Sequence, residues 1–131
     1  MTLQDYECVK QLWIDCGLSD ELEDRREDIA GFLVSPQSSA FIAHEDGKIA
    51  GVALCGNDGR YGYIHHLAVA KLKRNDGIGR ALVQACVDFL QKRHIIIMVR
   101  EHNEAGNEFW KHLSFQKVDG LCIHYLKANV E

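Results

Sequence analysis

The sequence has little that would tie it to a membrane or to nucleic acid. It contains no apolar run near the roughly 18 residues of a membrane-spanning helix, and no charged leader followed by an apolar segment. It has no excess of positive charge, because its 15 lysines and arginines stand against 19 aspartates and glutamates. General nucleic-acid binding needs a strongly basic surface. We therefore expect a cytoplasmic protein that binds neither membranes nor nucleic acids.

Cysteine pairs at the spacing of metal ligands or redox motifs are also lacking. The five cysteines are Cys8, Cys16, Cys55, Cys86 and Cys122. An odd and widely scattered set predicts reduced, mostly buried thiols in the cytosol. Four histidines fit no metal spacing either, so we expect no metal site and expect these four at the surface. They are His44, His94, His112 and His124.

The length of 131 residues is typical of a single domain, and we expect one over residues 1–131. Apolar residues at spacings of three and four predict a helix over residues 3–16. A second helix is expected from Ser19 or Asp20 to just before Pro36. Three short strands joined by tight turns then predict an antiparallel meander. These strands span residues 40–43, 49–55 and 61–69.

The second half of the chain alternates helices with apolar strands. After two glycines, an apolar stripe predicts a helix that ends near His94. Residues 95–99 are wholly apolar, which is typical of a parallel strand buried on both faces. Asn103 should cap a short helix that runs through His112. Two closing strands are expected over residues 115–118 and 121–126.

Residues 61–82 combine a strand, a basic loop and two glycines, Gly77 and Gly79, that open a helix. Such a turn leaves backbone N–H groups unpaired at the positive end of the helix dipole, and this geometry binds phosphate. The stretch is not a P-loop, which needs a Lys-Ser or Lys-Thr pair after its last glycine, because Arg80 follows Gly79. It is not a dinucleotide fingerprint, because Leu82 replaces the third small residue.

The pattern Arg74-x-x-Gly77-x-Gly79 after a strand resembles the acyl-coenzyme A loop of the GCN5-related N-acetyltransferases. Residues 103–115 are similar to the second motif of that family, and residues 55–67 look closest to small bacterial acetyltransferases. The resemblance implies an α/β (α+β) acyl-CoA N-acyltransferase fold with about four helices. Its sheet would be mixed and mostly antiparallel, with a central parallel pair splayed at a bulge. The first strand of the family is missing or vestigial in this sequence.

The resemblance implies an enzyme that transfers the acetyl group of acetyl-CoA to a primary amine, of a small molecule or a protein, by direct attack of the amine. The strand end would bond the pantetheine arm, the loop would hold the pyrophosphate, and two residues of the second motif would face the coenzyme. The implied coenzyme-binding residues are Leu67, Ala68, Val69, Arg74, Asn75, Asp76, Gly77, Ile78, Gly79, Arg80, Asn103 and Trp110. We expect the carboxylate of Asp76 to point to solvent, because a pyrophosphate would repel it.

The sequence leaves the catalytic base open. His65 or His66 titrates in the right range, although each is also consistent with an ordinary half-buried histidine. Glu101 and His102, just past the apolar strand, are further candidates. Trp110 stands where the family usually has a tyrosine that acts as general acid, and an indole N–H does not titrate usefully.

The acceptor amine is expected to be a cation attracted by acidic residues of the second helix, which otherwise form a solvated helix face. These residues are Glu21, Glu23, Asp24, Glu27 and Asp28. Met98 stands where ribosomal-protein acetyltransferases of this fold carry glutamate, which disfavours that substrate class. The alternative to an enzyme is a non-catalytic acyl-CoA-binding or regulatory module of the same fold, which the replacement of tyrosine by Trp110 favours. A monomer and a homodimer both fit the sequence.

Overall fold

In the computed structural model, which describes residues 1–129, the chain divides into two compact units, Met1–Met98 and Val99–Glu131. The strands are β1 (Ser38–Glu45), β2 (Lys48–Asn57), β3 (Tyr61–Val69) and β4 (His94–Ile97). The helices are η1 (Leu3–Asp5), α1 (Tyr6–Asp15), α2 (Arg26–Val34), η2 (Lys71–Lys73), α3 (Ile78–Leu90) and α4 (Glu104–His112). Within residues 1–129, every helix is too short or too polar to cross a bilayer.

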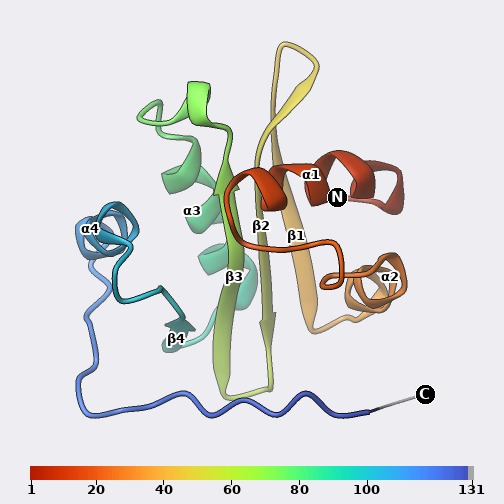
Figure 1. Cartoon of the computed structure of the whole chain (residues 1–131). Helices are drawn as coiled ribbons and strands as arrows, with labels where there is room; N and C mark the ends of the chain where they lie inside the picture. Colours follow the sequence, from red (N-terminus) through yellow and green to blue (C-terminus); the bar gives the residue numbers. More distant parts are fainter. Residues whose placement is uncertain (130–131) are drawn as a thin grey trace. The chain divides into compact units, whose positions relative to one another are not determined.

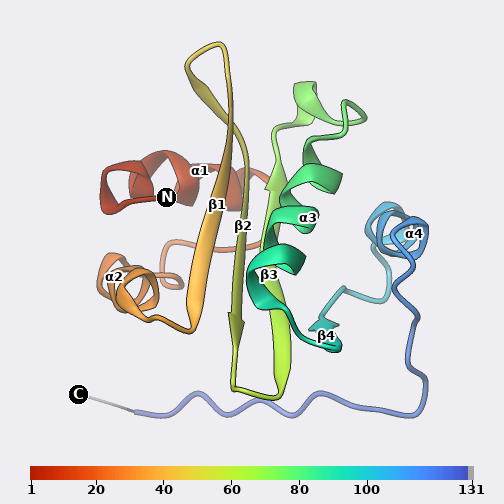
Figure 2. The ribbon, with the colours of Figure 1, turned by 180° about the vertical axis from the view of Figure 1, so that it is seen from behind.

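The first unit is a sheet covered on both faces. Its strands lie in the order β1-β2-β3-β4, with α1 and α2 over one face (Figure 1) and α3 over the other, as Figure 2 shows from behind. The first three strands form the antiparallel meander that the sequence predicts, and β4 pairs with β3 in parallel. Asp46 and Gly47 make the turn between β1 and β2 with φ of 52° and 76°, as an Asp-Gly hairpin turn requires.

Helix α1 buries the apolar stripe that predicts it. Tyr6, Val9 and Trp13 are buried and form one core with residues of β2 and β3. The sheet residues in this core include Val52, Leu54 and Ala68. Among the described residues η1 is the first element, and α1 follows it directly.

The second helix starts later than the sequence predicts. Residues 19–25 form a loop in which Oδ1 of Asp20 accepts the N–H groups of Leu22 and Glu23, at 2.8 and 3.0 Å. Asp20 therefore closes a turn and does not cap a helix, because aspartate bonds its own nearby backbone readily outside helices. Helix α2 begins only at Arg26. The acidic residues before Arg26 thus lie in a loop.

Helix α3 approaches β2 closely because Gly51 leaves room for it. A Cβ on Gly51 would stand 3.0 Å from Cδ1 of Leu82, 3.1 Å from Cγ2 of Ile78 and 3.1 Å from the carbonyl oxygen of Ala68. Gly51 is also the partner of Val69, at the end of β3. This packing holds the first turn of α3 beside the end of β3.

Helix α3 ends at Leu90 and not near His94 as expected. Gln91 takes up the left-handed conformation, with φ of 48°, which stops a helix and redirects the chain toward β4. Near this end of the helix Leu90 is buried, whereas Phe89 is 37% exposed.

Two expectations for the sheet after α3 are wrong. Strand β4 is not buried on both faces, since Ile96 is 43% and Met98 60% exposed. Residues 115–118 and 121–126 form no strand, and their large apolar side chains from Val118 onward are exposed. Strands need a hydrogen-bonded partner, and within residues 1–129 these two segments have none. Without closing strands, β4 is the edge of an open sheet.

The thiols are less buried than expected, and the four histidines are exposed as expected. Cys55 of β2 and Cys86 of α3 are buried. Cys8 and Cys122 are exposed, because one lies on the solvent side of α1 and the other in the segment without a strand partner. All five are free thiols.

Candidate active site

Strand β3 carries a bulge at His66. Between the pairs Val52–Ala68 and Leu54–His65, one residue of β2 faces two residues of β3, which defines a β-bulge. His66 is one of the two and has φ of 51°, a left-handed conformation that histidine adopts more readily than most residues. The bulge beside the parallel pair, which the family resemblance implies, is confirmed.

The bulge brings His65 and His66 to the same face of the sheet. The β2 partners of His65 and Ala68 both belong to the core under α1, so His65 and Ala68 face α1. In a regular strand, residues three apart face opposite sides, and the extra residue of the bulge changes this phase. The ring of His66 also lies on this face, edge-on to Trp13 of α1 with the ring centroids 4.9 Å apart. The two histidine side chains therefore do not face opposite sides of the sheet, as adjacent residues of a regular strand do.

Trp13 holds the backbone of the bulge as well. Its side chain is fully buried, and its Nε1–H donates to the carbonyl oxygen of His66 at 3.1 Å. A bulge disrupts the ladder of the strand, and here an indole N–H satisfies a carbonyl that the ladder leaves. Helix α1 therefore fixes the conformation of His66.

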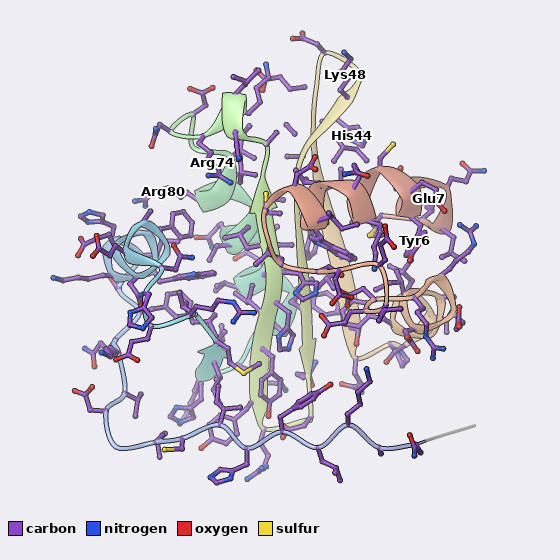
Figure 3. All side chains as sticks on the ribbon, in the orientation of Figure 1. Tyr6, Glu7, His44, Lys48, Arg74 and Arg80 are labelled. Atoms are coloured by element: carbon purple, nitrogen blue, oxygen red, sulfur yellow. The ribbon has the colours of Figure 1, made fainter. Side chains whose placement is uncertain are left out.

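Asp24 approaches His66 from the loop before α2. Its Oδ2 lies 2.8 Å from Nε2 of His66, and the two side chains are 22% and 28% exposed. The hydroxyl of Tyr6, on α1 (Figure 3), donates to the carbonyl oxygen of Asp24 at 2.7 Å. The sequence singles out Asp24 only as one acidic residue of an acceptor wall. Its pairing with His66 spans 42 positions and has no local signal.

His65 has a different environment. Its ring stacks on that of Tyr63, with centroids 5.9 Å apart. Burial lowers the pKa of His65, and the neighbouring His66 lowers that pKa further. A ring that resists protonation is a weaker proton acceptor, whereas His66 has a carboxylate beside it. Of the two histidines, His66 is the one with a carboxylate at hydrogen-bond distance from its ring.

Strand β3 has an open edge beyond the bulge. Strand β4 pairs only with residues 61–64 of β3, although β3 continues to Val69. Within residues 1–98, no strand pairs with residues 65–69 on that side. Backbone groups along such an edge can bond an extended ligand as an added strand would. The stretch Leu67–Ala68–Val69, predicted to bond pantetheine, lies here.

Arg74 ties the basic loop to the end of β3. Its Nε donates to the carbonyl oxygen of Val69 at 3.1 Å, and its Nη2 lies 3.5 Å from Sγ of Cys16, which follows α1. The Cys16 thiol lies 3.8 Å from the same Val69 oxygen. Lys73 pairs with Glu45 of β1 at 3.5 Å. The carbonyl of Val69 thus already has partners, a restraint that the sequence does not reveal.

The first turn of α3 has donors without partners. Gly77 precedes the helix in the left-handed conformation (φ 82°), and no side chain caps it. The first intrahelical bond runs from Ala81 N–H to the Gly77 carbonyl, so the N–H groups of the preceding helical residues have no partner within the helix. Arg80 stands in this turn, near Arg74 (Figure 3). Asp76 is exposed, as expected.

The remaining predicted site residues lie in the second unit. Asn103 caps α4 as predicted, with its Oδ1 accepting the N–H of Gly106 at 2.9 Å. A Cβ on Gly106 would stand 2.4 Å from Nδ2 of Asn103, so glycine in this position leaves room for the cap. The Trp110 ring packs edge-on to Phe115, with centroids 5.0 Å apart. Glu101 is exposed and precedes the helix.

The acidic residues of the expected acceptor wall do not form one helix face. Glu27 and Asp28, in the first turn of α2, pair with Arg25 at 3.5 and 3.3 Å. Glu21 and Glu23 are exposed in the preceding loop. Asp24 is turned onto His66 and is the member of the set with a direct contact to a predicted catalytic residue.

Known proteins share both the sequence pattern and the fold. The sequence model of the Acetyltransferase (GNAT) family matches residues 6–115. An acetyltransferase of Pectobacterium atrosepticum is 32% identical over 130 residues, which are 97% of this chain and 91% of that protein. The N-alpha-acetyltransferase 30 of Schizosaccharomyces pombe is 30% identical over 97 residues, which are 68% of this chain and 65% of that protein.

Solved structures with the same fold include two aminoglycoside acetyltransferases. One, from an uncultured soil metagenomic sample and in complex with sisomicin, has a TM-score of 0.79 at 16% identity, over 97% of this chain and 90% of that chain. The other, in complex with CoA, has a TM-score of 0.77 at 15% identity, over 98% of this chain and 97% of that chain. At such identities the likeness shows the fold alone. Because the family pattern covers most of the sequence, this chain belongs to the GNAT family of acetyltransferases.

Proposed function

We propose that the protein transfers the acetyl group of acetyl-CoA to a primary amine. The observation that carries the proposal is the open edge of β3, which runs past His66 and leads into the first turn of α3. This one stretch combines a backbone edge for an extended arm, unpaired helix N–H groups for a phosphate, and a histidine with a carboxylate partner. Membership in an acetyltransferase family supports the same reaction.

The coenzyme is proposed to lie along this stretch. The N–H groups of Ile78, Gly79 and Arg80 would hold the pyrophosphate, because they are unpaired at the positive end of the helix dipole. The guanidinium groups of Arg74 and Arg80 add positive charge. The pantetheine arm would bond Leu67 and Ala68, since the Val69 carbonyl already accepts from Arg74. The roles of Asn103 and Trp110 at the pantetheine arm rest on the second motif.

His66 is the base in this proposal. It accepts a proton from the ammonium form of the acceptor and becomes an imidazolium. The freed amine lone pair then forms a C–N bond to the thioester carbon, and the C–S bond breaks, with its electron pair leaving on the coenzyme sulfur. The nitrogen loses its second proton to water and the thiolate takes a proton from water, so that the products are the amide and CoA. Acid–base groups of this kind typically contribute ~10²–10⁴-fold to the rate. His65 and Glu101 remain alternative candidates.

The leaving thiolate needs no dedicated acid. Trp110 offers only an indole N–H, which does not titrate usefully. The conjugate acid of a thiolate has a pKa near ~8.5, so water can supply the proton. Replacement of the family tyrosine by Trp110 would therefore lower the rate without abolishing turnover.

The acceptor is proposed to be a small cationic amine that approaches from the side of the loop before α2. Glu21 and Glu23 are exposed in this loop and would attract a cation. A chain of free thiols fits a cytoplasmic enzyme.

The proposal is tested by thiol release from acetyl-CoA over a panel of primary amines, with the acetylated product identified by mass spectrometry. We expect at least one amine to give CoA and acetylamine in equal amounts. The non-catalytic alternative would give acetyl-CoA binding by calorimetry but no thiol release with any amine. Absence of both binding and release would overturn the proposal.

A further inference from the structure

We propose that Asp24 is the positioning residue for His66, and that it makes Nδ1 the proton-accepting nitrogen of the ring. The inference rests on the role of His66 in the proposed function and extends the site to the loop between α1 and α2. It is carried by the contact between Oδ2 of Asp24 and Nε2 of His66, at 2.8 Å.

The contact fixes which nitrogen carries the proton. An ionised carboxylate only accepts hydrogen bonds, so the Nε2 that faces Asp24 must be the donor. A neutral imidazole has one protonated nitrogen, and its lone pair for a new proton is then on Nδ1. Among the hydrogen bonds of residues 1–129 none uses Nδ1, and Nδ1 is not among their buried atoms without a partner. That nitrogen is therefore open to solvent or to a substrate.

The two partners are each held in place by hydrogen bonds from side chains of α1. The Asp24 carbonyl accepts from Tyr6, and the Glu23 carbonyl beside it accepts from Nζ of Lys10. The His66 carbonyl accepts from Trp13, whose indole also contacts the imidazole ring. All three anchors come from α1, so one helix sets both the position of the carboxylate and that of the ring.

Both partners also have unusual backbones. Asp24 has φ of 50° and His66 has φ of 51°, and residues other than glycine rarely adopt this region. Such conformations persist where the surrounding structure over-determines them, and they cluster at functional sites. A contact that only held a surface loop in place would not require the left-handed conformation in both residues.

The inference predicts how a proton is handled during turnover. When His66 accepts a proton on Nδ1, its Nε2–H remains bonded to Asp24, and the carboxylate stabilises the imidazolium. The other charged and titratable groups around the pair are His65 on β3, Tyr6 and Lys10 on α1, and Glu23 in the loop. These groups are unchanged in an Asp24→Asn variant, so a changed tautomer of the His66 ring reports on Asp24 itself.

The direct test is ¹⁵N nuclear magnetic resonance of the histidine rings in the free protein, with His66→Gln used to assign the signals. We expect His66 of the wild type to carry its proton on Nε2. An asparagine can donate as well as accept, so Asp24→Asn should release this preference and give a mixture of tautomers. A wild-type ring protonated on Nδ1, or an unchanged tautomer in Asp24→Asn, would overturn the inference.

Kinetics separate a positioning role from a structural one. Asp24→Asn should lower kcat by ~10²-fold, at the lower end of acid–base contributions, with KM for acetyl-CoA unchanged. Asp24→Glu should restore part of kcat. Asp20→Asn changes a carboxylate of the same loop without touching His66 and serves as the control.

The outcomes distinguish this inference from the proposed function. If His66→Gln keeps its kcat, the assignment of the base is wrong, and the tautomer experiment still decides what Asp24 does to the ring. If His66→Gln loses turnover while Asp24→Asn keeps kcat and tautomer, the positioning role alone is wrong. If Asp24→Asn and Asp20→Asn raise KM and lower stability by equal amounts, the loop has only a structural role.

Discussion

The bulge at His66 and the loop around Gly77 lie close together in the chain and differ in how their polar groups are satisfied. At the bulge, side chains bond one another, since Asp24 bonds the His66 ring and Trp13 bonds its carbonyl. In the loop and the turn after it, the helix N–H groups have no partner within α3, and no side chain caps the helix. The His66 side chain at the bulge is paired without a ligand, whereas the first turn of α3 has backbone donors that a ligand would satisfy.

This difference suggests a division of tasks. Groups held in place before a substrate arrives suit proton transfer, because positioned groups contribute most when they need not reorganise. Groups left unpaired suit ligand binding, because an anion can accept their hydrogen bonds and is attracted by the positive end of the helix dipole. Substitutions in the loop should therefore change coenzyme affinity, and substitutions at the bulge should change turnover.

The largest effect is expected for Gly79→Asp in the first turn of α3. The new side chain would block the approach of a pyrophosphate to the backbone, and its charge would repel one. We expect acetyl-CoA binding to be lost in isothermal titration calorimetry, while the circular dichroism spectrum stays that of the wild type. Gly31→Asp is a matched control, because Gly31 is an exposed helical glycine of α2 with open space around its Cβ position. Wild-type affinity in Gly79→Asp would remove the pyrophosphate assignment.

A smaller effect is expected at Trp110, which tests whether binding and turnover also separate at the second motif. Trp110→Ala should raise KM for acetyl-CoA, because it removes a ring proposed to border the pantetheine arm. Trp110→Tyr should keep KM and leave kcat equal or higher, since a phenol can protonate the leaving thiolate. Trp110→Phe keeps the aromatic contact with Phe115 and controls for packing. Steady-state kinetics measure all three, and a loss of kcat in Trp110→Tyr would mean that the indole itself is catalytic.

The smallest effect concerns His65 and sharpens the contrast with its neighbour. Burial lowers the pKa of His65 in the folded protein, so the unfolded chain binds the proton more readily. Stability should then fall as pH drops below the unfolded pKa of about 6.5. His65→Gln should lessen the decrease in Tm between pH 7.5 and pH 5.5, by about a few degrees. Thermal melts at the two pH values check this, and a steeper decrease in the variant would contradict the burial of a neutral ring.

Local patterns of the sequence predict much of the first unit. The Asp46–Gly47 turn, the stripe of α1 and the strand over residues 61–69 each follow from neighbouring residues. The Asn103 cap of α4 does so as well. The errors arise where a residue has two local uses or needs a distant partner. Asp20 closes a turn instead of starting a helix, and residues 115–126 have strand-like composition without a strand to pair with.

The candidate site was only partly predictable for the same reason. The motif residues from Arg74 to Arg80 are contiguous, so their pattern can be read directly from the sequence. The choice between His65 and His66 depends on a bulge that changes the phase of β3 and on Asp24, which comes from a distant loop. Nothing local in the sequence indicates either feature. Packing of α1 through Trp13 creates both.

The central claim is that the loop around Gly77 binds the coenzyme and that His66 at the bulge transfers the proton. It is tested most directly by measuring, on the same preparation of His66→Gln, the dissociation constant of acetyl-CoA and kcat with an active amine. We predict an unchanged dissociation constant and a kcat lowered by ~10²–10⁴-fold, the range of a lost acid–base group. His65→Gln, with the same chemical change one residue away, should lower kcat far less. A His66→Gln enzyme that turns over like the wild type would contradict the claim.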